Sequence, residues 1–227
     1  GFRTVWVKEQ YPADPNSISY VYDDLPAVGQ DMLEHGLHEL SVWGAHDDRL
    51  PYDEDIFYEE LGGFEGYRKN IGRLRDMGIN VAPLVSLFSI WRPMMERYGF
   101  DPNAADAAAG WVQNRWAIPS FQAPYLKTAQ CFVISQDNKL WQQDVREALR
   151  FLRDKAGVHS IGWDQYLAAP CEGNISDLLE EYIQQTKELH PDMAISGEST
   201  FFFEADINHL DYTWGWNYLG KIGDTRA

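Results

Sequence analysis

The fold is decided by the stretch Gly157-Val158-His159-Ser160-Ile161-Gly162-Trp163-Asp164-Gln165. Its apolar run is short and nearly continuous, as in a strand of a parallel sheet that is buried on both faces. The preceding residues, from Lys139 to Ala156, carry apolar side chains at helical spacing, and Gly157 suits the left-handed cap that ends many helices. The order is therefore helix, glycine, strand and carboxylate. Because α/β folds place their chemistry at the carboxyl ends of such strands, Asp164 is the first catalytic candidate.

The same order of helix, stop and strand recurs along the chain. Six strands are predicted in all, at residues 4–7, 39–43, 79–85, 158–163, 193–196 and 210–214. Strands that alternate with helices favour a parallel sheet, either closed as a (β/α)8 barrel or open and doubly wound. The sequence contains neither a G-x-G-x-x-G turn nor a G-x-x-x-x-G-K-[ST] loop, so the open nucleotide-binding alternative is disfavoured. We predict an α/β fold of the (β/α)8 TIM-barrel type.

The barrel is predicted to be incomplete. Eight βα units typically need about 250 residues, whereas the 227 residues of this chain also include a long insertion after the third strand. We expect about six βα units in a single partial domain, residues 1–227, with the last two units missing. The insertion, residues 88–138, shows little periodicity beyond a short helix at 104–109 and a strand at 131–134. Such long connections tend to be lids or binding loops, so we expect it to cover the carboxyl end of the barrel.

Composition and charge limit the partners. A chain with 44% hydrophobic residues can bury a core, and a net charge of −16 would repel phosphate backbones and anionic lipid. We therefore expect a neutral carbohydrate substrate, no nucleic acid and no membrane insertion. No zinc motif such as H-E-x-x-H is present, and we expect neither metal nor cofactor.

Cys131 and Cys171 are interpreted as free thiols, which could pair if the protein is secreted. The sequence leaves the compartment open, and secretion or a periplasmic location is compatible with it. The oligomeric state also stays open.

Two carboxylates stand at matched positions. Asp164 follows one predicted strand and Glu198 follows the next, one βα unit further along. Adjacent strands lie about 4.8 Å apart, which suits the roughly 5 to 5.5 Å between the two carboxyl groups of a retaining glycosidase. In that chemistry Glu198 must keep its proton near neutral pH, which burial beside aromatic side chains would favour. Each carboxylate alone is equally explained as the N-cap of the next helix.

Further candidates for sugar binding surround these strand ends. Aromatic side chains offer flat apolar faces with hydrogen-bonding edges, and polar groups beside them suit hydroxyl groups. The charge-rich loop after the second strand is better explained as solvated surface than as a site, and tryptophans on strands are usually core residues. The substrate-binding candidates are Trp43, His46, Asp47, Trp91, Arg92, Gln165, Tyr166, Trp214 and Trp216.

The middle third of the chain resembles known barrel domains. The run from Gln130 through Trp141, the helix after it and residues 157–165 are similar to uncharacterised glycoside-hydrolase-like TIM-barrel domains. Those domains show a cysteine-proline element, a tryptophan-led helix, and then glycine, strand and Asp-Gln. Here Phe132 replaces the proline after Cys131.

More widely, an Asp at one strand end and a Glu at the next resembles the α-amylase clan and endo-α-N-acetylgalactosaminidases. The resemblance implies that Asp164 is the nucleophile and Glu198 the acid/base. The arginine that the α-amylase clan carries two residues before its nucleophile is Gly162 here. The α-galactosidase-like clan also has its nucleophile on this strand but takes its acid from a later one, which would keep Asp164 alone.

These observations predict a glycosidase that cleaves an O-glycosidic bond with retention of configuration. The substrate class would be an oligosaccharide, a polysaccharide or a glycoconjugate. Two alternatives stay open: a carbohydrate-binding barrel without catalysis, and an α-galactosidase-like hydrolase that uses Asp164 with an acid from a later strand.

Overall fold

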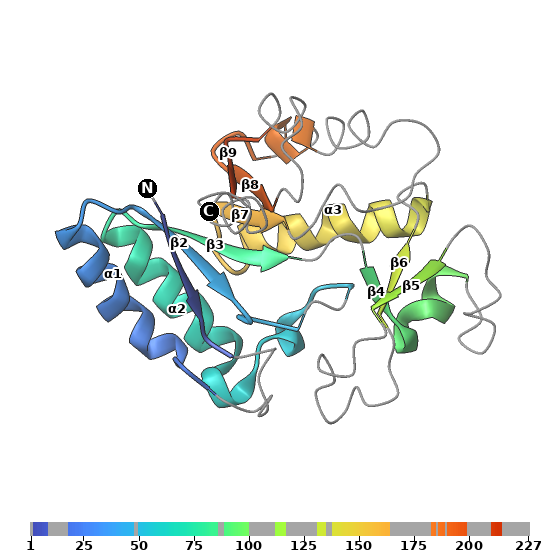
Figure 1. Ribbon diagram of the computed structural model, residues 1–227, viewed down its shortest axis with the longest axis horizontal. Helices are drawn as coiled ribbons and strands as arrows, with labels where there is room; N and C mark the ends of the chain where they lie inside the picture. Colours follow the sequence, from blue (N-terminus) through green and yellow to red (C-terminus); the bar gives the residue numbers. More distant parts are fainter. Residues whose placement is uncertain are drawn as a thin grey trace, which may run out of the picture.

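A computed structural model describes residues 2–8, 18–47, 50–85, 89–99, 112–116, 131–134, 138–163, 183–184, 186–188, 190–198 and 210–214. Six strands form one parallel sheet in the order β1-β2-β3-β7-β8-β9 (Figure 1). They are β1 (Phe2–Trp6), β2 (Glu39–Trp43), β3 (Asn80–Val85), β7 (Ser160–Trp163), β8 (Ala194–Glu198) and β9 (Tyr212–Trp214). Their order in space follows their order in the chain, as in a barrel. The six predicted strands are confirmed.

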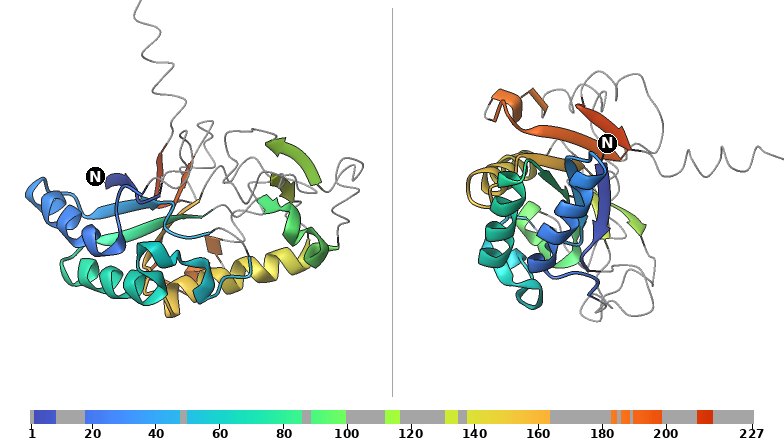
Figure 2. Two further views of the ribbon diagram at one scale, coloured as in Figure 1. Left: turned by 90° about the horizontal axis from the view of Figure 1, so that it is seen from below. Right: turned by 90° about the vertical axis from the view of Figure 1, so that its left-hand side faces the viewer.

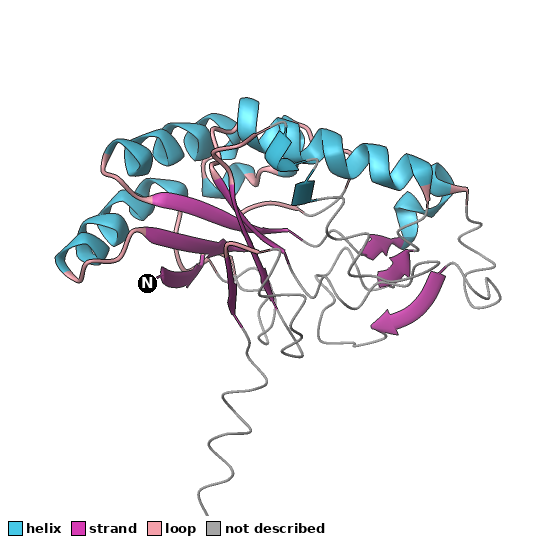
Figure 3. Ribbon diagram, turned by 90° about the horizontal axis from the view of Figure 1, so that it is seen from above, coloured by secondary structure: helices cyan, strands magenta, loops and turns pink. Residues whose placement is uncertain are grey.

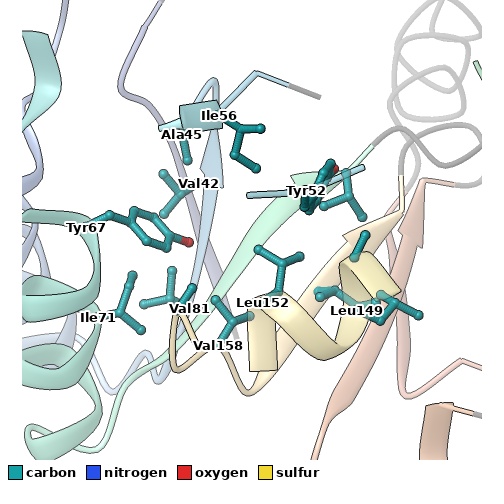
Figure 4. Close-up of a cluster of buried hydrophobic side chains, with 14 of the residues drawn as sticks. Val42, Ala45, Tyr52, Ile56, Tyr67, Ile71, Val81, Leu149, Leu152 and Val158 are labelled. Atoms are coloured by element: carbon teal, nitrogen blue, oxygen red, sulfur yellow. The ribbon is translucent and has the colours of Figure 1, made fainter. Parts of the chain in front are cut away.

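Within the described residues, three helices cover one side of this sheet: α1 (Leu25–Glu34), α2 (Gly63–Asp76) and α3 (Lys139–Asp154) (Figures 2 and 3). Each presents apolar residues at helical spacing to the strands. Figure 4 shows Tyr67 and Ile71 of α2 beside Val42 and Val81 of the sheet, with residues of α3 packed next to them. The core therefore lies between helices and sheet. Of the predicted helix before β8, only residues 183–184 and 186–188 are described.

Gly157 has the left-handed conformation predicted for it and lies two residues after Lys155, the residue that caps α3. The helix begins after Asn138, whose side-chain oxygen accepts a hydrogen bond of 3.1 Å from the Trp141 backbone N–H. The helix ends shortly before Gly157, which has a φ of +75°. Residues other than glycine adopt this conformation only with strain. The Val158 N–H then returns to the Leu152 carbonyl at 2.9 Å and starts the chain toward β7.

The two faces of the parallel sheet differ in polarity. Val42 and its register partner Val5 belong to the apolar core beneath the helices. The strand positions that alternate with such core residues include buried polar side chains, such as Ser41 on β2 and Ser160 on β7. The Ser160 hydroxyl donates a 2.6 Å hydrogen bond to Glu39, although β3 lies between the strands that carry them. A contact across an intervening strand requires a strongly curved sheet, so this polar face is the inner, concave one.

The insertion contains a small sheet of its own. Strands β4 (Ser89–Trp91), β5 (Val112–Trp116) and β6 (Cys131–Ile134) pair antiparallel in the order β4-β6-β5, and η4 (Arg92–Tyr98) follows β4. The predicted strand at 131–134 is confirmed, and the predicted helix at 104–109 lies outside the described residues. Strands β4 and β5 were not expected, because each pairs with a segment distant in sequence. Figure 1 shows α3 reaching from the parallel sheet to this small sheet.

Among the described residues, no helix has the length and apolar character needed to cross a membrane.

Candidate active site

The carboxyl ends of β7, β8 and β9 lie side by side. Trp163, the last residue of β7, pairs with Gly197, and Glu198, the last residue of β8, pairs with Trp214. Asp164 follows Trp163 in the sequence and lies outside the described residues. Of Glu198 and Trp214 the structure describes the backbone. The two strands that lead to the candidate carboxylates are therefore neighbours with matched ends, about 4.8 Å apart as in any sheet.

Trp43 lies at the corresponding end of β2, where its register partner on β1 is Trp6. Their ring centroids are 4.4 Å apart with an interplanar angle of 62°, an edge-on arrangement that aromatic pairs favour. The Trp43 indole N–H donates to the Ser41 hydroxyl at 3.1 Å. Trp43 is 7% exposed but does not belong to the core cluster beneath the helices, so its burial is on the inner face of the sheet.

Two features fix the chain after β2. Gly44 has a φ of +65°, and a Cβ at this position would lie 2.4 Å from the Lys8 carbonyl oxygen. Only glycine therefore lets the ends of β1 and β2 approach this closely. Lys8 also donates to Glu60 at 2.7 Å and lies over the Tyr58 ring at 4.0 Å. The hydrogen bond from Lys8 lowers the pKa of the Glu60 carboxyl below its usual range.

His46 is buried within the loop after β2 rather than on an open surface. Its ring packs edge-on against Tyr52 and Phe57, with centroids 5.2 and 5.6 Å away. Burial lowers the pKa of His46 to about 4, so the imidazole is neutral at physiological pH. Its Nε2 atom has no hydrogen-bond partner within the described parts of the chain. Next to it, half-buried Asp47 donates its backbone N–H to the Ile56 carbonyl at 2.8 Å.

The remaining candidates are placed only in part. Trp91 ends β4 and Arg92 begins η4, and the structure describes their backbone. Gln165, Tyr166 and Trp216 lie outside the described residues. The described structure thus brings Trp43, His46 and Asp47 together at the end of β2, and Glu198 and Trp214 together at the ends of β8 and β9.

The segment that carries Trp91 and Arg92 is fastened to α3. Five residues further along, Arg97 forms hydrogen bonds of 2.6 and 2.7 Å with both oxygens of Asp144, whose side chain is 1% exposed. The Tyr98 hydroxyl donates to the same carboxylate at 2.8 Å, and its ring packs edge-on against Trp141. Charge-assisted bonds to a buried carboxylate hold geometry tightly, so η4 has a fixed place on α3.

No group of three or more His, Cys, Asp or Glu side chains within the described ranges is arranged to hold a metal ion.

A helix-covered parallel sheet with six successive strands is the architecture of a (β/α)8 barrel, and several solved structures share this fold. An α-amylase from Lactobacillus plantarum matches 98% of this chain and 54% of its own, with a TM-score of 0.67 and 13% identity. A maltogenic α-amylase from Thermotoga neapolitana matches 98% and 50%, with a TM-score of 0.63 and 11% identity. Trehalose-6-phosphate hydrolase from Bacillus licheniformis matches 94% and 48%, also with a TM-score of 0.63 and 11% identity.

The chain therefore has the fold of the α-amylase-type glycoside hydrolases and spans about half the length of these structures. This agrees with an incomplete barrel. At such low sequence identity the likeness concerns the fold alone. No model of a known protein family matches the chain, and no curated protein matches its sequence.

The sequence interpretation missed one residue that the structure brings to this end of the sheet. Trp6 was assigned to the opening strand, which was expected to run to residue 7, and no role was given to its side chain. In the structure β1 ends at Trp6, beside Trp43. The signal was its place near the end of a strand, because aromatic residues there stand at the face where barrels carry their sites.

Proposed function

We propose that this chain is the catalytic part of a glycoside hydrolase that cleaves an O-glycosidic bond with retention. Asp164 attacks the anomeric carbon, and Glu198 protonates the leaving oxygen and then activates water. The observation that carries the proposal is the pairing of Trp163 with Gly197, because the two candidate carboxylates follow these partners in the sequence. The α-amylase-type fold supports the same reading.

The proposed domain organisation is a single partial barrel over residues 1–227, with residues 88–138 inserted over its substrate face. The proposed substrate is a neutral carbohydrate, which a chain of net charge −16 does not repel. Its binding would involve aromatic and polar residues at the carboxyl ends of the strands and in the insertion, namely Trp43, His46, Asp47, Trp91, Arg92, Gln165, Tyr166, Trp214 and Trp216.

The test is a screen of chromogenic α- and β-glycosides with the intact parent protein, followed by Asp164→Asn and Glu198→Gln. Loss of the nucleophile is expected to lower kcat by at least about a thousandfold, as for removal of other covalent catalysts. Glu198→Gln should lose most activity on substrates with poor leaving groups and retain more on activated aryl glycosides, because those need no acid. Full activity in Asp164→Asn would contradict the proposal.

The same variants separate the alternatives. An α-galactosidase-like hydrolase would lose activity in Asp164→Asn and keep it in Glu198→Gln, since its acid comes from a later strand. A carbohydrate-binding barrel would bind glycans without cleaving any of them. In that case both carboxylate variants would change only the affinity.

A further inference from the structure

The amino-terminal part of α3 extends beyond the carboxyl ends of the parallel strands. The helix runs antiparallel to β7, because the chain turns back after α3 and enters that strand. Its 16 residues span about 24 Å, whereas the four residues of β7 span about 13 Å. Figure 1 shows α3 reaching past the arrowheads of the parallel strands to the small sheet. The first two turns of α3 therefore lie on the side of the candidate site.

The insertion is bound to these two turns through the end of η4. The Asp144 carboxylate accepts two hydrogen bonds from Arg97, at 2.6 Å from Nε and 2.7 Å from Nη2, and a third at 2.8 Å from the Tyr98 hydroxyl. The Asn138 side-chain amide donates to the Tyr98 carbonyl at 3.1 Å, and the Tyr98 ring packs edge-on against Trp141. We call these five residues the η4 clamp.

The η4 clamp is better suited to fixing an orientation than to adding stability. Apolar residues can often replace a buried ion pair without loss of stability. Two bonds from one guanidinium group to both oxygens of one carboxylate, however, fix the relative orientation of the two groups. The Asp144 side chain is 1% exposed, so water does not compete for these bonds. The clamp therefore sets the direction in which η4 leaves α3.

The segment that the clamp orients carries two of the proposed substrate-binding residues. Strand β4 begins four residues after β3 ends, and so lies within about 14 Å of that carboxyl end. Strand β3 in turn pairs with β7, which leads to Asp164. Trp91 ends β4, and Arg92 begins η4 about 10 Å along the helix from Arg97. Trp91 and Arg92 are thus placed beside the candidate carboxylates, where the outer units of a bound oligosaccharide would lie.

We infer that the η4 clamp is a positioning element that gives the site a preference for oligosaccharides over single sugar units. The inference rests on the proposed function and extends it, because Arg97, Tyr98 and Asp144 determine affinity without contacting the substrate. Binding residues that are fixed in advance lose less conformational freedom when the ligand binds. A single sugar held at the carboxylates would not reach η4, so its binding does not depend on the clamp.

The test compares Arg97→Gln, which removes the ionic partner of Asp144, with Tyr98→Phe, which removes one hydrogen bond and keeps the ring. Calorimetric titration of the intact protein uses maltoheptaose and chitohexaose, together with glucose and N-acetylglucosamine. The wild type is expected to bind at least one oligosaccharide more tightly than its monosaccharide. That affinity should fall about tenfold or more in Arg97→Gln and about threefold in Tyr98→Phe, while the monosaccharide affinity stays within about twofold.

The matched control is Arg68→Gln, which breaks the exposed pair with Glu65 on α2 and should change no affinity. A pair that only stabilises the fold would lower the number of molecules able to bind, not the affinity of those that remain folded. Far-UV circular dichroism identifies the folded variants, and Tyr98→Phe decides if Arg97→Gln does not fold. Unchanged oligosaccharide affinity in the folded variants, an equal loss for the monosaccharide, or no oligosaccharide binding to the wild type would overturn the inference.

Hydrolysis separates this inference from the proposed function. If cleavage depends on Asp164 but the KM for oligosaccharides is the same in wild type and folded clamp variants, the inference fails while the proposed function stands. If oligosaccharide affinity depends on the clamp and no glycoside is cleaved, the proposed function fails and the positioning role stands.

Discussion

The hydroxyl group of Tyr67 is buried in the apolar core, and no hydrogen-bond partner for it occurs in the described part of the chain. Its neighbour Tyr22, whose ring lies 5.2 Å away edge-on, donates its own hydroxyl to the Ala45 carbonyl. Burying a hydroxyl group without a hydrogen-bond partner lowers stability by about 1–3 kcal/mol, whereas a hydrogen bond that is formed raises it by about 1 kcal/mol. Two tyrosines in contact therefore have opposite effects on stability.

We expect Tyr67→Phe to raise the free energy of unfolding by about 1 kcal/mol, because it removes a buried polar atom without disturbing the packing. Tyr22→Phe should lower it by about 1–2 kcal/mol, since the Ala45 carbonyl then loses its partner. Urea denaturation followed by circular dichroism measures both. Destabilisation of Tyr67→Phe by as much as Tyr22→Phe would mean that the Tyr67 hydroxyl has a partner in solution.

His46 makes stability depend on pH. Burial lowers its pKa to about 4 from 6.5, so the folded protein binds fewer protons at this site than the unfolded chain between these values. The contribution of neutral His46 to the free energy of unfolding is therefore fully present above pH 6.5 and is lost as the pH falls toward 4. At about 1.4 kcal/mol per pKa unit, the loss is about 3 kcal/mol.

The measurement compares wild type with His46→Phe, which keeps a ring between Tyr52 and Phe57 but cannot be protonated. Free energies of unfolding at pH 7 and pH 4 are determined for both proteins. The wild type should lose about 3 kcal/mol more than the variant over this range. Other titrating groups act on both proteins alike, so parallel pH curves would show that His46 is solvated in the folded state.

At the scale of elements, α3 joins the insertion to the barrel. Asp144, in its amino-terminal half, is bound by Arg97 and Tyr98 of η4, while Leu149 and Leu152, further along, belong to the main core. One helix thus packs against both parts. The pairing matters for the proposed site, because Arg92 begins the same η4 segment.

We expect Arg97→Gln to lower the free energy of unfolding by about 2 kcal/mol, because it leaves the Asp144 carboxylate buried without its ionic partner. The matched control is Arg68→Gln, which removes an exposed ion pair with Glu65 at 2.8 Å on α2. Exposed pairs of this kind contribute about 0.3–0.5 kcal/mol. Urea unfolding of both variants checks the prediction, and equal small losses would show that the Arg97–Asp144 pair does not hold η4 in solution.

The elements that sequence predicts well are those with local signals. The strand at residues 39–43 was predictable from its own apolar residues, and the left-handed conformation of Gly157 was predictable from the glycine itself. Both signals lie within a few residues of the sequence. Strands β4 and β5 were not, since their partner β6 lies far along the chain. The burial of Asp144 was equally hidden, because a charged residue in an amphipathic helix usually faces solvent and its partner comes from another segment.

In the candidate site, too, some features could be predicted from the sequence and others could not. The sequence predicted that two strand ends with carboxylates are neighbours, and the β7–β8 pairing confirms the neighbouring strands, while Asp164 itself lies outside the described residues. For Trp43 the sequence favoured a core position over the substrate face. The choice depends on which face of β2 packs on the helices, and Val42 takes that face. The sequence shows that Val42 and Trp43 lie on opposite faces of β2, but only the three-dimensional structure shows which face packs against the helices.

At the scale of the whole molecule, charge opposes folding. The chain carries 35 acidic and 19 basic residues, a net charge of −16, and compaction brings these like charges closer together. Salt screens this repulsion, with a Debye length of about 10 Å at 0.1 M and about 3 Å at 1 M. Salt also weakens exposed ion pairs such as Arg68–Glu65, but each of these contributes less than about 1 kcal/mol. With so large an acidic excess, relief of repulsion should outweigh the lost pairs.

We therefore expect the thermal midpoint to rise by a few degrees, roughly 2–4 °C per kcal/mol of stabilisation, between 20 mM and 300 mM sodium chloride at pH 7. Differential scanning calorimetry measures this shift. Sodium chloride is preferred to sulfate, because sulfate also strengthens apolar burial and would raise the midpoint for another reason. A repeat with guanidinium chloride at equal ionic strength below 0.3 M should give a smaller rise, since that salt screens charge but weakens burial. A midpoint that falls with sodium chloride would mean that the acidic residues are balanced locally by ion pairs rather than repelling one another across the fold.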